Sequence, residues 1–95
     1  MKGGFQDAKF RMYCDPGHSW LGVSFRYLRE LGLIEQISNF SYYKGGTAYL
    51  EEDCDAPKFL KAFEQKYGYK PVIREFTRNS DSPIRRYNPY TFGAK

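Results

Sequence analysis

The sequence predicts a single α+β domain, a two-layer sandwich with the βαββαβ order of ferredoxin-like folds, followed by an extended C-terminal arm. The first observation is length, because 95 residues with 41% hydrophobic content support one core but not two. The second is that period-two and period-3.6 hydrophobic patterns follow one another in that order. The third is the distribution of charge, because the whole net positive charge of +4 lies after residue 69. We therefore predict a domain over residues 1–78 and a basic, aromatic arm over residues 79–95.

The first elements of the domain are a strand and a turn. Residues 9–14 alternate polar and bulky side chains, which is typical of a strand with two unlike faces. Residues 15–17 read Asp-Pro-Gly and predict a type II turn, since glycine accepts a positive φ at its third position. Residues 18–23 are typical of either a loop or a short return strand, so an extra strand near Trp20 stays open.

A short helix and a hairpin follow. Ser24 predicts the start of a helix, because its hydroxyl can accept from unpaired backbone N–H groups, and Gly32 predicts the end of that helix. The side chains of residues 39–44 and 47–51 follow the period-two pattern of strands, and two glycines separate the two segments. This arrangement predicts a β-hairpin with a type I′ turn.

A second helix and a last strand complete the domain. Asp55 predicts a helix cap, the apolar stripe after it predicts a buried helix face, and Gly68 predicts the end of the helix. Residues 69–77 read as a strand, with Pro71 at its edge or start.

One face of this sheet is expected to lack helices. In a two-layer fold helices cover a single face, so the other face reaches solvent. The predicted pairing places five aromatic or basic side chains there: Arg11, Tyr13, Phe40, Tyr42 and Tyr49. Exposed patches of this kind usually mark a binding surface. The alternative is that the arm or a second copy of the chain, as in a homodimer, covers these rings.

Cations and aromatic rings alternate near the end of the chain. This combination suits single-stranded nucleic acid, which needs phosphate contacts and stacking surfaces. The predicted binding residues there are Arg74, Arg78, Arg85, Arg86, Tyr87 and Tyr90. Trp20 is the remaining candidate, either as a core residue or as an exposed anchor for a partner. In a competing account, the arm docks on the acidic residues 51–55 of its own chain or of a neighbour.

Two cysteines and one histidine are candidates for chemistry. The ferredoxin-like order would bring Cys14 and His18 close to Cys54 at one sheet edge, where they could bind a soft metal or form a thiolate nucleophile. Their spacing matches no standard ligand motif, and no oxyanion-hole motif is recognisable. We therefore predict no cofactor, no metal, no disulfide and no enzymatic activity, and keep a Cys/His metal or thiol site as an alternative.

The expected location is the cytoplasm, without membrane contact. The chain opens without the apolar run of a signal peptide, and nowhere do about 18 apolar residues follow one another.

A partial resemblance links the hairpin to RNA-recognition motifs, which share the predicted topology. Gly46, Ala48, Tyr49 and Leu50 agree with the longer signature of that family, whereas Thr47 and Glu52 stand where aromatics are expected. The resemblance implies base stacking on the sheet.

Two blocks, residues 13–20 and 49–55, resemble small proteins encoded in phage and plasmid genomes. That resemblance implies an accessory protein or inhibitor that acts by contact on a host defence or nucleic-acid-processing complex. We therefore predict a non-enzymatic binding protein with a protein partner, and single-stranded nucleic acid is the alternative partner.

Overall fold

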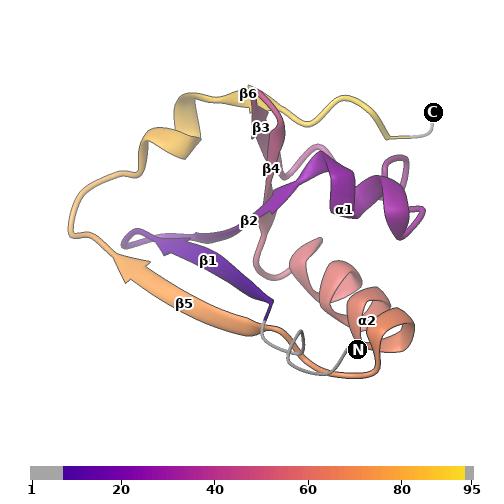
Figure 1. Ribbon diagram of the computed structural model, residues 1–95. Coiled ribbons are helices and arrows are strands. Elements are labelled where there is room, and N and C mark those ends of the chain that lie inside the picture. Colours follow the sequence, from indigo (N-terminus) through magenta and orange to yellow (C-terminus); the bar gives the residue numbers. More distant parts are fainter. Residues whose placement is uncertain (1–7, 94–95) are drawn as a thin grey trace.

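The structure, a computed structural model, describes residues 8–93 as one mixed sheet with two helices against one of its faces (Figure 1). The elements are β1 (Lys9–Cys14), β2 (Ser19–Ser24), α1 (Phe25–Glu30), β3 (Tyr42–Lys44), β4 (Thr47–Glu51), α2 (Ala56–Tyr67), β5 (Val72–Thr77), the 3₁₀ turn η2 (Pro83–Arg86) and β6 (Asn88–Pro89). The strand order is β5-β1-β2-β4-β3-β6. The predicted α+β class is confirmed.

The ferredoxin-like strand order is not found, because residues 15–18 close a tight hairpin. The Asp15 N–H donates to the His18 carbonyl at 2.9 Å, and Cys14 pairs with Ser19. The segment around Trp20 is therefore a strand, β2, which takes the place beside β1 that the predicted order gave to residues 47–51. β5 lies parallel to β1 on its other side. As a result β1 and β4 run in the same direction but are separated by β2.

The turn types differ from those predicted. Gly17 does not have a positive φ, so the first turn is not type II. The Asp15 carboxylate holds this turn instead by accepting from the N–H groups of Gly17 and His18 at 3.0 and 2.9 Å. In the second hairpin the two-residue loop is confirmed, but Gly45 has φ 59° whereas Gly46 has no positive φ, which excludes type I′.

The core lies between the sheet and the helices. The Phe10 ring meets the rings of Phe59 and Phe63 edge-on, with centroid distances of 5.2 and 5.8 Å. Side chains from three further elements complete this layer: Leu21, Val23, Leu28, Ala48 and Leu50. Ser24 caps α1 as predicted, because its hydroxyl accepts from the Arg26 N–H at 3.1 Å.

The arm packs on the domain from Ser82 to Phe92. It leaves β5, passes along the side of the sheet away from the helices as η2, and adds β6 beside β3 at the sheet edge (Figure 1). Tyr90 then enters the core, where it is 1% exposed and its hydroxyl donates to the Ile34 carbonyl. Burial, and secondarily the charge of Asp55, raises the pKa of Tyr90 to about 12. Tyr90, predicted as a binding residue, is therefore a core residue.

Within residues 8–93, neither helix has the length and apolar character that crossing a bilayer requires.

Candidate functional site

A row of four aromatic rings crosses the face of the sheet that the helices leave uncovered. Phe76 of β5, Tyr13 of β1, Tyr49 of β4 and Tyr87 of the arm follow one another with centroid distances of 6.0, 6.1 and 5.2 Å. Tyr13 and Tyr49 meet across β2 because Gly22 lies between them. A Cβ atom on Gly22 would lie 3.3 Å from the Tyr13 ring and 3.6 Å from the Tyr49 ring. The glycine thus keeps the row continuous.

Two adjoining hollows lie along this row, and we call them together the sheet groove. Their volumes are about 350 and 260 Å³, and both are lined by Tyr13 and Tyr49. The larger hollow lies between the sheet and Pro83 and Ile84 of the arm. Three cations line the groove: Lys9, Arg11 and Arg78. Among the described residues that line it, none is Asp or Glu.

Positive charge gathers beside the row of rings. Arg11 and Arg74 stand directly opposite each other on β1 and β5. Like charges in that position destabilise a sheet, and no carboxylate of residues 8–93 lies within ion-pair distance of either guanidinium. The Arg11 guanidinium lies 5.5 Å from the centroid of Phe76, and the Lys44 ammonium lies 4.9 Å from that of Tyr87. The groove therefore favours a ligand that carries both negative charge and flat rings.

Tyr49, the middle of the three tyrosines in the row, has a raised pKa. Burial raises the pKa of Tyr49, and the neighbouring Tyr87 and Tyr13 raise it further. Like any tyrosine hydroxyl, it carries no negative charge near neutral pH.

An ion pair between the buried Asp15 and the half-buried Arg85 anchors the arm. The Arg85 guanidinium donates two hydrogen bonds to the Asp15 carboxylate, from Nε at 2.6 Å and Nη2 at 2.9 Å, and the Ser82 N–H adds a third at 2.9 Å. Arg85 holds the pKa of Asp15 well below its usual range, with help from backbone N–H groups, although burial opposes this shift. The guanidinium also lies 5.5 Å from the Trp20 ring. Arg85, predicted to contact a partner, therefore fastens the arm over Trp20. The sequence had suggested residues 51–55 as the docking site for the arm.

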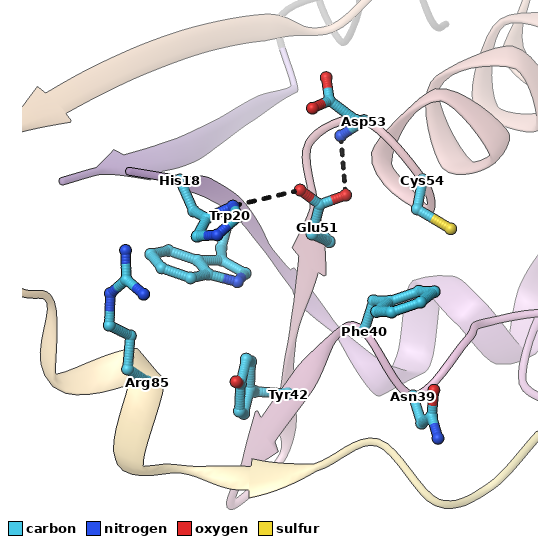
Figure 2. A pocket seen from close by; sticks show the side chains of 9 residues that line it. All are labelled: His18, Trp20, Asn39, Phe40, Tyr42, Glu51, Asp53, Cys54 and Arg85. Atoms are coloured by element: carbon cyan, nitrogen blue, oxygen red, sulfur yellow. Dashed lines mark hydrogen bonds and ion pairs between the residues drawn. The ribbon is translucent and has the colours of Figure 1, made fainter. Parts of the chain in front are cut away.

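A second cavity lies next to Trp20, and we call it the Trp20 pocket. Its volume is about 470 Å³, and it is lined by His18, Trp20, Asn39, Phe40, Tyr42, Glu51, Asp53, Cys54 and Arg85 (Figure 2). Trp20 and Glu51 are directly opposite each other on β2 and β4. His18 Nδ1 lies 3.8 Å from Glu51 Oε2, which is an ion pair only when the imidazole is protonated. Trp20 Nε1 is buried and makes no hydrogen bond within residues 8–93.

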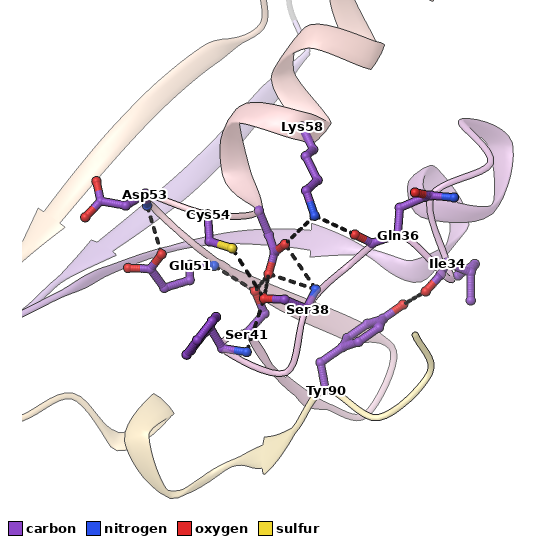
Figure 3. Close-up of polar contacts among 11 residues, drawn as sticks. Ile34, Gln36, Ser38, Ser41, Glu51, Asp53, Cys54, Lys58 and Tyr90 are labelled. Atoms are coloured by element: carbon purple, nitrogen blue, oxygen red, sulfur yellow. Dashed lines mark hydrogen bonds and ion pairs between the residues drawn. The ribbon is translucent and has the colours of Figure 1, made fainter. Parts of the chain in front are cut away.

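The loop beside this pocket is held by Asp55. This residue precedes α2 as predicted, but its side chain makes no capping bond. Instead, it accepts from the hydroxyls of Ser38 and Ser41 and pairs with Lys58 at 3.3 Å. Figure 3 labels these three partners. Burial alone would raise the pKa of Asp55, but hydrogen bonds from Ser41 and Ser38 outweigh it and lower the pKa. The network fixes the loop that carries Phe40 to the rim of the pocket.

The cysteines and the histidine do not form one cluster. Cys14 lines the sheet groove, whereas His18 and Cys54 line the Trp20 pocket. In the part of the chain that the structure describes, no three His, Cys, Asp or Glu side chains are grouped to hold a metal ion.

The predicted binding residues differ in accessibility. The exposed ones are Arg11, Phe40, Arg74, Arg78 and Arg86, the half-buried ones are Tyr13, Tyr42, Tyr49, Arg85 and Tyr87, and the buried ones are Trp20 and Tyr90. Sequence reasoning missed Phe76, Lys44 and Gly22. Phe76 could have been found from its period-two spacing after Arg74, which puts both side chains on one face.

None of the protein-family models, curated proteins or solved structures with which the chain was compared matches it.

Proposed function

We propose that this chain is a non-enzymatic binding protein that holds single-stranded nucleic acid in the sheet groove. The row of four rings carries the proposal, because it lies beside two guanidinium groups, Arg11 and Arg74, that have no carboxylate partner among the described residues. Stacking of a base on an aromatic side chain contributes about 1–3 kcal/mol, and cations bind the phosphates. The geometry therefore favours the partner that the sequence suggested as the alternative.

A single strand fits the groove better than a duplex does. Aromatic side chains stack only on bases that are not already stacked inside a helix. The rings of Tyr13, Tyr49 and Tyr87 are half-buried between the sheet and the arm, so a base must leave its own stack to reach them. Stacking accepts any base, and the groove by itself confers little sequence preference.

The double substitution Arg11→Gln/Arg74→Gln tests this proposal. We expect affinity for a fluorescent oligothymidine to fall about tenfold, because two phosphate contacts are lost. The slope of log K against log salt should become shallower by about 1.4, which fluorescence anisotropy at several salt concentrations measures. Stability should stay the same or rise by a few tenths of a kcal/mol, since two opposed like charges are removed.

The matched control is Arg29→Gln/Lys61→Gln. It removes the same charge from exposed positions on the two helices, away from the groove. The proposal predicts that this control binds nearly as tightly as the unaltered chain. Equal weakening by both pairs would mean that overall charge, rather than the groove, attracts the strand.

A protein partner is the second candidate, and one observation favours it. The outermost strand, β5, exposes Val72 and Phe76 at 45% and 44%, and a strand from another protein could pair along its open edge. An accessory protein of the phage or plasmid type, acting on a host complex, would bind in this way. This candidate predicts a complex from host lysate that survives salt of about 0.5 M, where phosphate contacts fail.

A further inference from the structure

The Trp20 pocket carries negative charge. Glu51 and Asp53 both line it. Of the described residues that line it, Arg85 alone is Lys or Arg, and its Nε and Nη2 already donate to the buried Asp15 at 2.6 and 2.9 Å. This ion pair is close to neutral as a whole, so the two lining carboxylates decide the sign of the charge in the pocket. The pocket therefore favours a cation, whereas the sheet groove, which cations line, favours an anion.

One of these carboxylates keeps an oxygen available to a ligand. The Glu51 side chain is 14% exposed where it lines the pocket. Its Oε1 accepts from the Asp53 N–H at 2.9 Å. Its Oε2 lies 3.8 Å from His18 Nδ1, beyond hydrogen-bond distance, and accepts no hydrogen bond within residues 8–93. A largely buried carboxylate in this state favours a cation that also donates hydrogen bonds, because such charge-assisted bonds are stronger than neutral ones.

Aromatic side chains form the rest of the wall. The Tyr42 ring lies 6.3 Å from the buried Trp20 ring, and Figure 2 shows Glu51 between Trp20 and Phe40 in this view. Phe40 is 68% exposed, so its ring is open to a ligand. Ring faces attract cations, and a guanidinium group, being flat, can stack on a ring while its N–H groups reach a carboxylate. An ammonium group has no flat face to stack, so the pocket favours arginine over lysine.

The rim of the pocket suits a protein partner. Ser38 and Ser41, on either side of Phe40, donate to the buried carboxylate of Asp55, and this network holds the loop with its large ring in solvent. Exposed rings on a fixed surface are typical of protein interfaces. The pocket, at about 470 Å³, also leaves room beside a guanidinium group for further side chains of the same partner.

We infer that the Trp20 pocket binds an arginine side chain of a protein partner. The guanidinium group stacks on Phe40 and donates to Glu51 Oε2, and apolar residues next to that arginine cover the exposed ring. The inference does not depend on the proposed function, because Arg85 of the arm lines this pocket while other residues of the arm line the sheet groove. The two sites take ligands of opposite charge.

Nα-acetylarginine amide is the smallest probe of this site. Backbone amide NMR of the full chain should show saturating shift changes at Phe40, Tyr42 and Glu51 during its titration. The amide of Nα-acetylcitrulline, which has the same shape without the charge, should bind at least about tenfold more weakly, and that of Nα-acetyl-lysine about threefold more weakly. No shift change in the pocket, or equal affinity for the arginine and citrulline amides, would overturn the inference.

Two variants and one control locate the binding. Glu51→Gln keeps an oxygen for the Asp53 N–H and should weaken binding about tenfold, because the charge is lost. Phe40→Ala removes an exposed ring and should weaken binding about threefold. The control Glu52→Gln removes the same charge at an exposed position that is not among the described lining residues, and should change affinity less than about twofold. Circular dichroism checks the fold. Equal weakening by Glu51→Gln and Glu52→Gln, or unchanged affinity in both pocket variants, would contradict the site.

A pentapeptide with arginine between two leucines tests the nature of the partner. It should bind at least about tenfold more tightly than the arginine amide, and lose this gain in Phe40→Ala. Free arginine that binds more tightly than the pentapeptide would overturn the inference in favour of a small-molecule site. Dimers in sedimentation velocity that Glu51→Gln abolishes would overturn it in favour of a second copy of the chain. Arg11→Gln/Arg74→Gln should bind the pentapeptide normally, so the pocket and the sheet groove can fail separately.

Discussion

Asp15→Asn is expected to lower the melting temperature by about 10 °C or more. The Asp15 side chain is fully buried and accepts hydrogen bonds from Arg85, from Ser82 and from two N–H groups of its own turn. An amide in its place directs two N–H donors at groups that are themselves donors, and leaves the half-buried guanidinium with only the exposed Asp81, 3.9 Å away, as a countercharge. Thermal unfolding followed by circular dichroism measures the effect. The matched control is Glu52→Gln, at an exposed position, which should change the melting temperature by little.

The same carboxylate predicts how stability depends on pH. Because Arg85 holds the pKa of Asp15 below its unfolded value of about 3.9, the contribution of this pair is present above that pH. It is lost as the pH falls further, toward the depressed pKa of the folded state. The difference in stability between the unaltered chain and Asp15→Asn should therefore begin to shrink below about pH 4. A constant difference between the two chains from pH 7 to pH 2 would contradict this assignment.

A chain that ends at Arg78 is expected to lose about 3–6 kcal/mol of unfolding free energy. It lacks Ile84 and Tyr90, which are 3% and 1% exposed, and it uncovers Trp20. Since domains are typically stable by about 5–15 kcal/mol, this loss leaves the chain marginal. Urea unfolding measures it, and Arg86→Ala, which alters an exposed residue of the same segment, serves as the control. A truncated chain with an unchanged urea midpoint would mean that the arm adds no stability.

Removal of the arm is therefore an ambiguous test of binding. The arm supplies Tyr87 to the ring row and Arg85 to the Trp20 pocket, but it also supports the fold. Point substitutions at exposed cations, such as Arg11 and Arg74, separate binding from folding where truncation does not.

Local features of the fold were readable from the sequence because each depends on neighbouring residues. The hairpin register, with Tyr43 opposite Ala48, follows from period-two alternation around a two-residue loop. The end of α2 follows from Gly68, whose φ of 82° suits a residue without a Cβ. The position of β2 could not be predicted, because residues 18–23 fit either a loop or a strand. Only their pairing with β1 and β4 makes them a strand.

The path of the arm was not predicted for a different reason. Asp15 reads locally as a turn residue, and Arg85 reads locally as a surface cation. Nothing in the spacing of two residues so far apart in the chain indicates that they pair, and the pairing gains its strength only when folding buries Asp15 and partly buries Arg85. Asp55 is a similar case, because its sequence position indicates a helix cap, whereas its carboxylate accepts hydrogen bonds from Ser38 and Ser41 in a distant loop. Sequence periodicity located the uncovered face of the sheet, while the arm that divides it became visible only in three dimensions.

The most direct test of the central claim is backbone amide NMR of the full chain during titration with a short oligothymidine at low salt. The sheet groove predicts chemical-shift changes concentrated at the ring row, around Tyr13, Tyr49, Phe76 and Tyr87, with the outer faces of α1 and α2 unaffected. Changes confined to the helices, or no change at a concentration of oligonucleotide that saturates other single-strand binders, would contradict a nucleic-acid site on this face of the sheet.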